Sequence, residues 1–246
     1  MTNPRKIALV TGASRGLGRE IALELAANSY DVILSCKERI ALAEEVAAKI
    51  GEIGQKAWIF PADLADSLAI QALASKTRAI SASLDLLVCN AGTTLNRLIL
   101  RTTPADFNDE ITINLVGQAR LCRALLPEIA AVNGQIVLIS SRAALVGNSG
   151  QAAYTCAKAG LIGLGAELAA ECAGAGVRVN TVLPGYLPTE MGLAAGEKVV
   201  VAAREANFLQ RLNDCGEVAR FISHLAGMKN VSGQVFNLDS RPLDMF

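Results

Sequence analysis

The sequence is poor in histidine and in aromatic side chains, and neither sign of charge is in excess. Its 246 residues include one histidine, His224, and 4% aromatic residues, and 23 basic side chains balance 23 acidic ones. One histidine is too few for the usual zinc sites and leaves catalysis to other bases. Nucleic-acid-binding proteins carry a basic excess, which is missing here. We therefore expect no metal site and no nucleic-acid partner.

Long uncharged runs are also missing, although 52% of the residues are hydrophobic. The longest stretch without Asp, Glu, Lys or Arg runs only from Ala143 to Ala157. A transmembrane helix needs about 20 predominantly apolar residues, so this stretch is too short to span a membrane. Residues Met1 to Gly12 lack the apolar core of a signal peptide. We expect a soluble, cytoplasmic protein that does not associate with membranes.

The six cysteines form no Cys-x-x-Cys pair. Disulfide frameworks are found mainly in small secreted proteins, and a chain of this length can bury a sufficient core without them. We predict buried free thiols at Cys36, Cys89, Cys122, Cys156, Cys172 and Cys215.

Short apolar runs alternate along the chain with longer helical patterns. Strands are predicted at Lys6–Thr11, Asp31–Ser35, Lys56–Pro61, Leu84–Cys89, Gly134–Ser140, Val177–Leu183 and Gln234–Leu238. Helices are predicted at Gly16–Asn28, Ile40–Ile50, Ser67–Ser81, Pro104–Val132, Ala152–Ala173 and Cys215–Gly227. Strands that are apolar throughout are typical of parallel sheets covered on both faces. We predict an α/β protein: one Rossmann-type domain over residues 1–246, with a doubly wound, seven-stranded parallel sheet and helices on both faces.

One segment interrupts the alternation of strands and helices. Residues 186–213 insert two prolines, glycine and helix-forming residues between two predicted strands. Long segments beyond the carboxyl end of a strand are where α/β enzymes place substrate loops. We expect a substrate lid here, and an ordinary pair of surface helices is the alternative.

A glycine-rich segment, Thr11-Gly12-Ala13-Ser14-Arg15-Gly16-Leu17-Gly18, lies between the first predicted strand and the first predicted helix. Glycines at this place allow a tight turn and a close approach of the backbone to a pyrophosphate, and the helix start favours negative charge. The placement predicts a dinucleotide site. A glycine-rich turn without a ligand is the alternative.

The end of the second predicted strand indicates which dinucleotide binds. NAD-dependent proteins place an acid there for the ribose hydroxyl, but this chain has Ser35-Cys36-Lys37 and no carboxylate until Glu38. Arg15 and Lys37 supply positive charge suited to a 2′-phosphate. The sequence favours NADPH over NADH, and solvated surface cations are the alternative.

Hydroxyl and amine groups follow the fifth predicted strand. Ser141 ends that strand, and Tyr154 and Lys158 are four residues apart in the next predicted helix. This spacing places the phenol and the ammonium group on one helix face, where a cation lowers the pKa of the phenol. Such a pair can transfer a proton to or from a carbinol oxygen that a serine hydroxyl orients.

Together and in this order, the motifs resemble those of the short-chain dehydrogenase/reductase family, from about Lys6 to Asp239. Further segments carry the resemblance: Asp63-Leu64, Cys89-Asn90-Ala91-Gly92 with Cys89 in place of an asparagine, Asn114, and Pro184-Gly185 through Thr189. The resemblance implies hydride transfer between a nicotinamide cofactor and a carbonyl group.

The resemblance also assigns roles to individual residues. It implies that Ser141 orients the carbonyl group and that Tyr154 donates the proton. Lys158 would lower the pKa of Tyr154 and bind the nicotinamide ribose, and Asn114 would relay protons. The cofactor-binding residues that it implies are Gly12, Ser14, Arg15, Gly16, Leu17, Gly18, Lys37, Asp63, Leu64, Asn90, Ala91, Gly92, Tyr154, Lys158, Pro184, Gly185 and Thr189.

Within the family, segments 90–97, 147–154 and 189–191 are most similar to bacterial 3-oxoacyl-(acyl carrier protein) reductases. This similarity implies that NADPH reduces a 3-oxoacyl thioester on acyl carrier protein or coenzyme A, in fatty acid or polyketide-type biosynthesis. It also implies a homotetramer, or a hetero-oligomer with a related subunit, assembled on the helices predicted at Pro104–Val132 and Ala152–Ala173.

The sequence departs from these reductases in places. The basic residues that dock the carrier are missing at 130–133 and 173–176, and Ser240-Arg241 replaces a glycine pair after the last strand. One open alternative is a dehydrogenase or reductase of a free ketone, sugar or steroid-like alcohol. The other is a non-catalytic partner subunit or nucleotide-sensing module, which would fit loss of Tyr154 or Lys158, but both are present.

Overall fold

A computed structural model describes residues 5–242 and is built around a seven-stranded sheet. The strand order is β3-β2-β1-β4-β5-β6-β7, and each neighbouring pair is parallel. The strands are Lys6–Thr11 (β1), Tyr30–Ser35 (β2), Ala57–Ile59 (β3), Leu86–Cys89 (β4), Gln135–Ile139 (β5), Arg178–Leu183 (β6) and Val235–Asn237 (β7). This confirms the predicted Rossmann-type sheet. The predicted domain, residues 1–246, includes four residues at each end that lie outside the described range.

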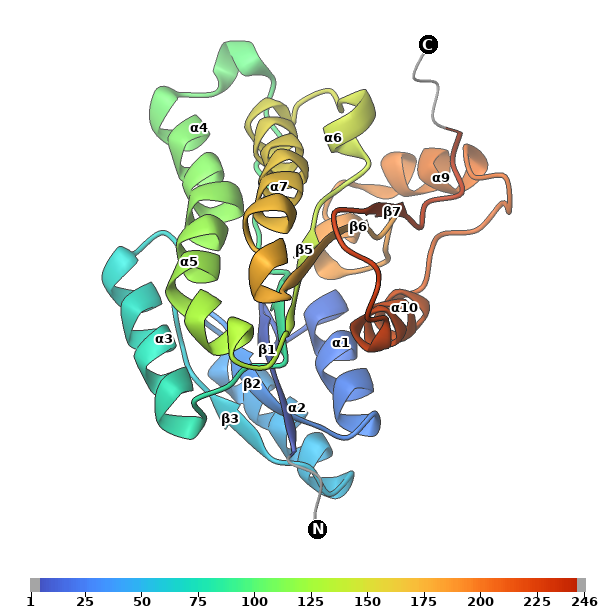
Figure 1. Cartoon of the computed structure of the whole chain (residues 1–246). Helices are drawn as coiled ribbons and strands as arrows, with labels where there is room; N and C mark the ends of the chain where they lie inside the picture. The colour runs from blue at the N-terminus through green and yellow to red at the C-terminus, as the bar shows by residue number, and fades with distance from the viewer. Residues whose placement is uncertain (1–4, 243–246) are drawn as a thin grey trace.

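Two layers of helices cover the sheet (Figure 1). Residues that alternate along β1 face opposite layers: Ala8 and Val10 pack with one cluster of buried residues and Leu9 with the other. The first cluster includes residues of α1 (Gly16–Ala27), α2 (Ile40–Glu52) and α10 (Cys215–Gly227). The second includes residues of α3 (Ser67–Ile80), α5 (Gly117–Ala130) and α7 (Ala152–Glu171). Burial on both faces explains why the strands are apolar throughout.

Side-chain caps fix the start of several helices. Asp66 accepts a hydrogen bond from the backbone of Leu68 at the start of α3, and Asp214 does so for Glu217 at the start of α10. Thr103 and Asp106 form a reciprocal capping box at the start of α4 (Pro104–Ile111). Such caps satisfy the backbone N–H groups that have no partner within a helix.

The helix predicted over Pro104–Val132 is not continuous. It consists of α4, a π-helical turn at Thr112–Val116 and α5. The side chain of Asn114 donates to the backbone oxygen of Glu110 at 2.9 Å within this turn. A Cβ on Gly117 would lie 2.2 Å from the backbone oxygen of Leu64, so only glycine permits the approach. The helix changes from α to π geometry at this point, where it makes close tertiary contacts. π turns of this kind are frequent at functional sites.

The segment predicted as a lid contains two short helices, α8 (Glu190–Leu193) and α9 (Glu197–Glu205). Another short helix that was not predicted, α6 (Ala143–Val146), follows Ser141. Within residues 5–242, no helix combines the length and apolar character that crossing a membrane requires. All six cysteines are free thiols, and four of them are buried as predicted. Cys215 is only half-buried, and Cys156 is exposed because the buried stripe of α7 runs through Ala153, Ala157 and Leu161.

Candidate active site

A cavity of about 1190 Å³ opens at the carboxyl ends of the strands. β1 lies between β2 and β4, so the winding of the sheet changes direction beside it, and open α/β sheets bind ligands at such switch points. All the site residues named from the sequence line this cavity, except Asn114: Gly12, Ser14, Arg15, Gly16, Leu17, Gly18, Lys37, Asp63, Leu64, Asn90, Ala91, Gly92, Ser141, Tyr154, Lys158, Pro184, Gly185 and Thr189.

The glycine loop is shaped by close backbone contacts. Gly12 has a φ of +66°, in the left-handed region that favours glycine. A Cβ on Gly18 would lie 2.2 Å from the backbone oxygen of Gly12, so helix α1 can begin this close to the loop only with glycine there. Asn90 holds the loop from the side, because its Nδ2 donates to the backbone oxygen of Thr11 at 2.9 Å. The glycines therefore let the loop pack closely against the residues that follow β4 and the start of α1 while it lines the cavity.

Cations gather where the sequence predicts a 2′-phosphate, but they are not free. The Nζ of Lys37 lies 2.9 Å from Oδ2 of Asp63, and this hydrogen bond raises the pKa of Lys37. Partial burial alone would raise the pKa of Asp63, but hydrogen bonds from the backbone of Ala65 and from Lys37 leave it below its usual value. Arg15 pairs with Glu190 at the start of α8. Lys37 is thus engaged by an acid that the sequence assigned to cofactor contact.

Sequence reasoning missed Arg39, which also lines the cavity. Its Nη2 lies 3.7 Å from Oε2 of Glu190, so Glu190 faces both Arg15 and Arg39. Arg39 adopts a φ of +62° just before α2. The position of Arg39 two residues after Lys37 could have indicated a third cation at this edge of the cavity. The left-handed backbone conformation of Arg39 is not visible in the sequence.

Ser141, Tyr154 and Lys158 meet on the other side of the cavity. Ser141 follows β5, and the other two residues project from α7. The Nζ of Lys158 lies 5.6 Å from the centroid of the Tyr154 ring and donates a hydrogen bond of 2.8 Å to the backbone oxygen of Ile139. Lys158 is only 3% exposed, and burial lowers its pKa to about 8. The structure thus brings together the three groups that the sequence predicts.

The protonation of Tyr154 differs from the expectation. We expected Lys158 to lower its pKa, but burial raises the pKa of Tyr154 above its usual value. A hydrogen bond with the side chain of Ser141 lowers it in part, and the nearby carboxylate of Glu110 raises it further. Removal from water disfavours the phenolate more than the hydrogen bond with Ser141 favours it. Tyr154 is therefore a phenol that can donate a proton.

Asn114 lies behind the cavity wall and is fully buried. Its Nδ2 donates to the backbone oxygen of Thr93 at 2.9 Å, and its Oδ1 accepts from the backbone N–H of Thr93 at 3.1 Å. A Cβ on Gly92 would lie 2.6 Å from Oδ1 of Asn114 and 3.5 Å from Nζ of Lys158. Asn114 and Lys158 thus both lie close to Gly92, without a direct hydrogen bond between them among residues 5–242.

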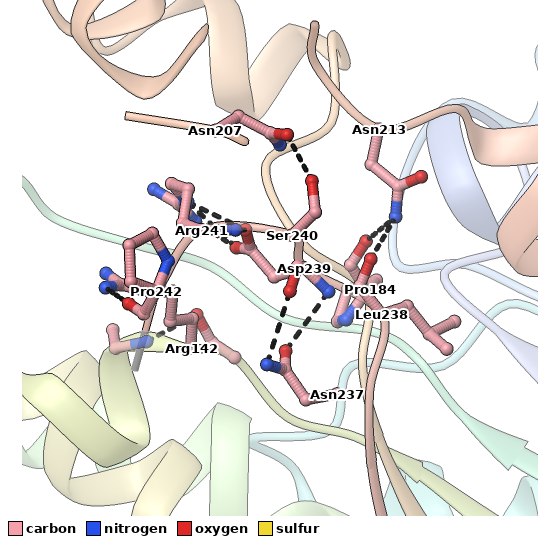
Figure 2. A network of polar contacts seen from close by, with 12 residues as sticks. Arg142, Pro184, Asn207, Asn213, Asn237, Leu238, Asp239, Ser240, Arg241 and Pro242 are labelled. Carbon is pink, nitrogen blue, oxygen red and sulfur yellow. Dashed lines mark hydrogen bonds and ion pairs between the residues drawn. The ribbon is translucent and has the colours of Figure 1, made fainter. Parts of the chain in front are cut away.

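The remaining wall of the cavity comes from Pro184, Gly185 and the lid. Figure 2 shows Asn213 joining this wall to the segment after β7: its Nδ2 donates to the backbone oxygens of Pro184 at 2.6 Å and Leu238 at 3.2 Å. Thr189 caps α8 by accepting a hydrogen bond of 3.2 Å from Gly192. Among the described residues, no three His, Cys, Asp or Glu side chains are grouped to hold a metal ion.

A doubly wound sheet with a tyrosine and a buried lysine side chain beside its switch point fits the class of Rossmann-type oxidoreductases. The sequence profile of the family described as short chain dehydrogenase matches residues 6–216. The chain therefore belongs to the short-chain dehydrogenase family and is an oxidoreductase.

Individual relatives agree with this family. The chain is 34% identical over 237 residues to a 3-oxoacyl-(acyl-carrier-protein) reductase of Staphylococcus aureus (strain Mu50), covering 95% of this chain and 96% of the relative. It is 36% identical over 238 residues to a reductase of the same name from Synechocystis, covering 95% of both. A solved short chain dehydrogenase from Burkholderia cenocepacia J2315, in complex with NADP, has a TM-score of 0.91 and 30% identity, covering 96% of this chain and 97% of that one.

Proposed function

We propose that this protein reduces a 3-oxoacyl thioester to the 3-hydroxyacyl thioester with NADPH. The main support is the placement of Ser141, Tyr154 and Lys158 beside a glycine-lined cavity at the switch point of the sheet. The relatives named as 3-oxoacyl-(acyl-carrier-protein) reductases, which match over nearly the whole chain, support the thioester as substrate.

The residues present fit a nicotinamide dinucleotide. Gly12, Gly16 and Gly18 line the cavity, and the close packing of Gly18 against the backbone oxygen of Gly12 gives the tight turn into α1 that such a cofactor needs. In the cofactor-bound enzyme, the loop backbone would hold the pyrophosphate, and Arg15 and Arg39 would hold the 2′-phosphate. When bound, NADPH supplies the hydride that reduces the carbonyl carbon.

The chain's own side chains handle the carbonyl oxygen. Ser141 donates a hydrogen bond that orients the carbonyl group, and Tyr154 gives its proton to the oxygen as negative charge develops there. The ammonium group of Lys158 stabilises the phenolate that Tyr154 leaves behind, and its pKa of about 8 lets it exchange a proton near neutral pH. Asn114 holds the backbone of Thr93 on this side of the cavity.

We further propose that the acyl group is presented on acyl carrier protein and that the chain forms a homotetramer. Exposed apolar side chains at the lid, among them Met191 at 43% and Val199 at 44%, line the cavity and suit an acyl chain. Exposed small residues on α7, such as Gly163 and Ala166, suit close packing between subunits. Light scattering of the purified protein tests the tetramer, and a monomer would contradict it.

The test of the activity is NADPH oxidation with 3-oxoacyl thioesters of increasing length, each presented on coenzyme A and on acyl carrier protein. Free ketones, sugars and steroid-like ketones form the comparison panel. We expect kcat/KM for thioesters to exceed that for every free ketone. The proposal fails if a free ketone is reduced more efficiently than all thioesters, or if NADPH binds and no carbonyl compound is reduced.

A further inference from the structure

Two arginines line the cavity on the side of Ser141, away from the glycine loop. Arg142 follows Ser141 directly in the chain, and Arg241 stands in the segment after β7. Arg241 is one of the two residues that replace the glycine pair of the related reductases. Neither arginine belongs to the glycine loop, and both line the same cavity as Ser141.

The segment after β7 is fastened in place by side chains from three other parts of the chain (Figure 2). Nη2 of Arg142 donates to the backbone oxygen of Pro242 at 2.7 Å. Ser240 is hydrogen-bonded to Asn207 after α9, and Asn213 holds the backbone of Leu238. The position of the two arginines is therefore set by the fold rather than by free side-chain rotation.

The two charges are compensated differently. Nε of Arg241 donates to Oδ1 and Oδ2 of Asp239 at 2.9 and 3.0 Å, and its guanidinium carbon lies 5.8 Å from the centroid of the Tyr186 ring. Asp239 is 1% exposed, so this ion pair is shielded from water and closed. Arg241 therefore brings no net charge to the cavity.

Within residues 5–242, Arg142 has no such partner. No carboxylate of residues 5–242 lies within ion-pair distance of its guanidinium group, and its buried Nε has no hydrogen-bond acceptor among them. The side chain is half-buried and lines the cavity. A guanidinium group carries five N–H donors, and the contact with Pro242 uses one of its nitrogens. A partly desolvated, uncompensated cation gains most from an anion that the ligand brings.

The position of Arg142 limits where the ligand carries that anion. Consecutive Cα atoms are about 3.8 Å apart, so Arg142 begins next to the serine proposed to hold the ketone oxygen. The phosphate of a pantetheine carrier is separated from the ketone by the whole thioester arm, so it does not suit this place. A carboxylate on the acyl chain, a few bonds from the ketone, suits this place.

We propose that Arg142 is a specificity-determining residue that binds a carboxylate at the far end of the acyl chain. The substrate class is then a 3-oxoacyl thioester of a dicarboxylic acid. This inference rests on the proposed function, because it assumes that Ser141 orients the ketone of a thioester.

The test compares two coenzyme A thioesters of equal chain length, 3-oxoadipyl and 3-oxohexanoyl, which differ only in a terminal carboxylate in place of a methyl group. In wild-type enzyme, kcat/KM for the carboxylate substrate should be at least about tenfold higher, since a bidentate guanidinium–carboxylate contact discriminates strongly against a ligand without the charge. In Arg142→Gln this preference should fall to about one, and in Arg142→Lys, which keeps the charge and loses the planar fork, it should be intermediate.

Arg101→Gln is the matched control, because Arg101 is exposed and does not line the cavity. Its preference should equal that of wild type. Wild-type enzyme that reduces the methyl-ended thioester as well as or better than the carboxylate substrate overturns the inference and leaves the proposed function standing. If neither coenzyme A thioester is reduced, the same pair is presented on acyl carrier protein: the inference fails without a preference for the carboxylate substrate there, and the proposed function fails as well if no thioester is reduced. Thermal unfolding shows whether the variants are folded. If Arg142→Gln does not fold, Arg142→Lys decides: a ratio of kcat/KM for the two thioesters equal to that of wild type overturns the inference.

Discussion

The ammonium nitrogen of Lys158 lies 5.6 Å from the centroid of the Tyr154 ring, one turn further along α7. Both side chains are removed from water, and burial shifts their pKa values in opposite directions: it raises that of Tyr154 and lowers that of Lys158 to about 8. Burial therefore disfavours the charged form of each group. Near neutral pH the phenol keeps its proton, which is the form needed to reduce a carbonyl group.

Replacing Tyr154 by phenylalanine removes the proton donor and leaves the ring. We expect kcat to fall by about 10²–10⁴-fold, the usual contribution of a general acid, whereas NADPH binding measured by fluorescence titration stays close to that of wild type. Tyr30→Phe is the matched control, because Tyr30 is also buried but does not line the cavity. A Tyr154→Phe enzyme that keeps most of its kcat would refute this role.

Replacing Lys158 by methionine changes how stability depends on pH. The amine loses its proton near pH 8 in the folded protein and at its ordinary pKa of 10.5 in the unfolded chain. Between these pH values the unfolded state binds more protons, so the wild-type protein gains stability as the pH rises. The methionine variant has no such group. Its stability relative to wild type should therefore fall by about 1.4 kcal/mol per pH unit, and about 3 kcal/mol over the whole range.

Urea unfolding of both proteins between pH 7 and 10.5 measures this difference. Lys49→Met is the control, because Lys49 is exposed on α2 and its replacement should leave the curve of stability against pH parallel to that of wild type. Parallel curves for Lys158→Met as well would mean that the pKa of Lys158 is not lowered in the folded protein.

Replacing Gly92 by alanine tests the place of Asn114 beside the site. The added Cβ would lie 2.6 Å from Oδ1 of Asn114, so the Asn114 side chain must move. We expect activity to fall at least about tenfold, because small displacements of positioning groups are costly in catalysis. Gly51→Ala in α2 meets no atom within 4 Å and should keep full activity with equal or slightly higher stability. Equal activity of both variants would contradict a role for this contact.

The sheet could be predicted from the sequence because its central strands are buried on both faces and are therefore mostly apolar, as in β4, where all four residues are buried. The π turn around Asn114 could not be predicted from the sequence, because its residues fit a continuous α-helix. It directly precedes Gly117, which lies against the backbone of Leu64, a contact between segments far apart in the chain. Local propensity carries no information about such an approach.

The candidate site was predictable only in part, because some of its features depend on local spacing and others on tertiary neighbours. Tyr154 and Lys158 are four residues apart on one helix, so their common face follows from local geometry. The place of Ser141 beside them was implied by the family resemblance. The pKa of Tyr154 was not predictable, because it depends on how deeply α7 is buried and on Glu110 from another element. The pairing of Lys37 with Asp63 likewise depends on neighbours that only the folded chain brings together. The same holds for the charge of Arg142, which has no carboxylate partner among residues 5–242.

Glu190 on the lid faces the two arginines proposed to bind the 2′-phosphate, lying against Arg15 and 3.7 Å from Arg39. A carboxylate there competes with the phosphate for the same cations. Glu190→Gln should therefore tighten NADPH binding by about two- to fivefold, the scale expected for exposed ion pairs. The affinity for NADH, which lacks this phosphate, should not change. Glu197→Gln, on the exposed first turn of α9, should change neither affinity. Isothermal titration with both cofactors measures the effect, and weaker or unchanged NADPH binding in Glu190→Gln would show that the lid carboxylate does not compete.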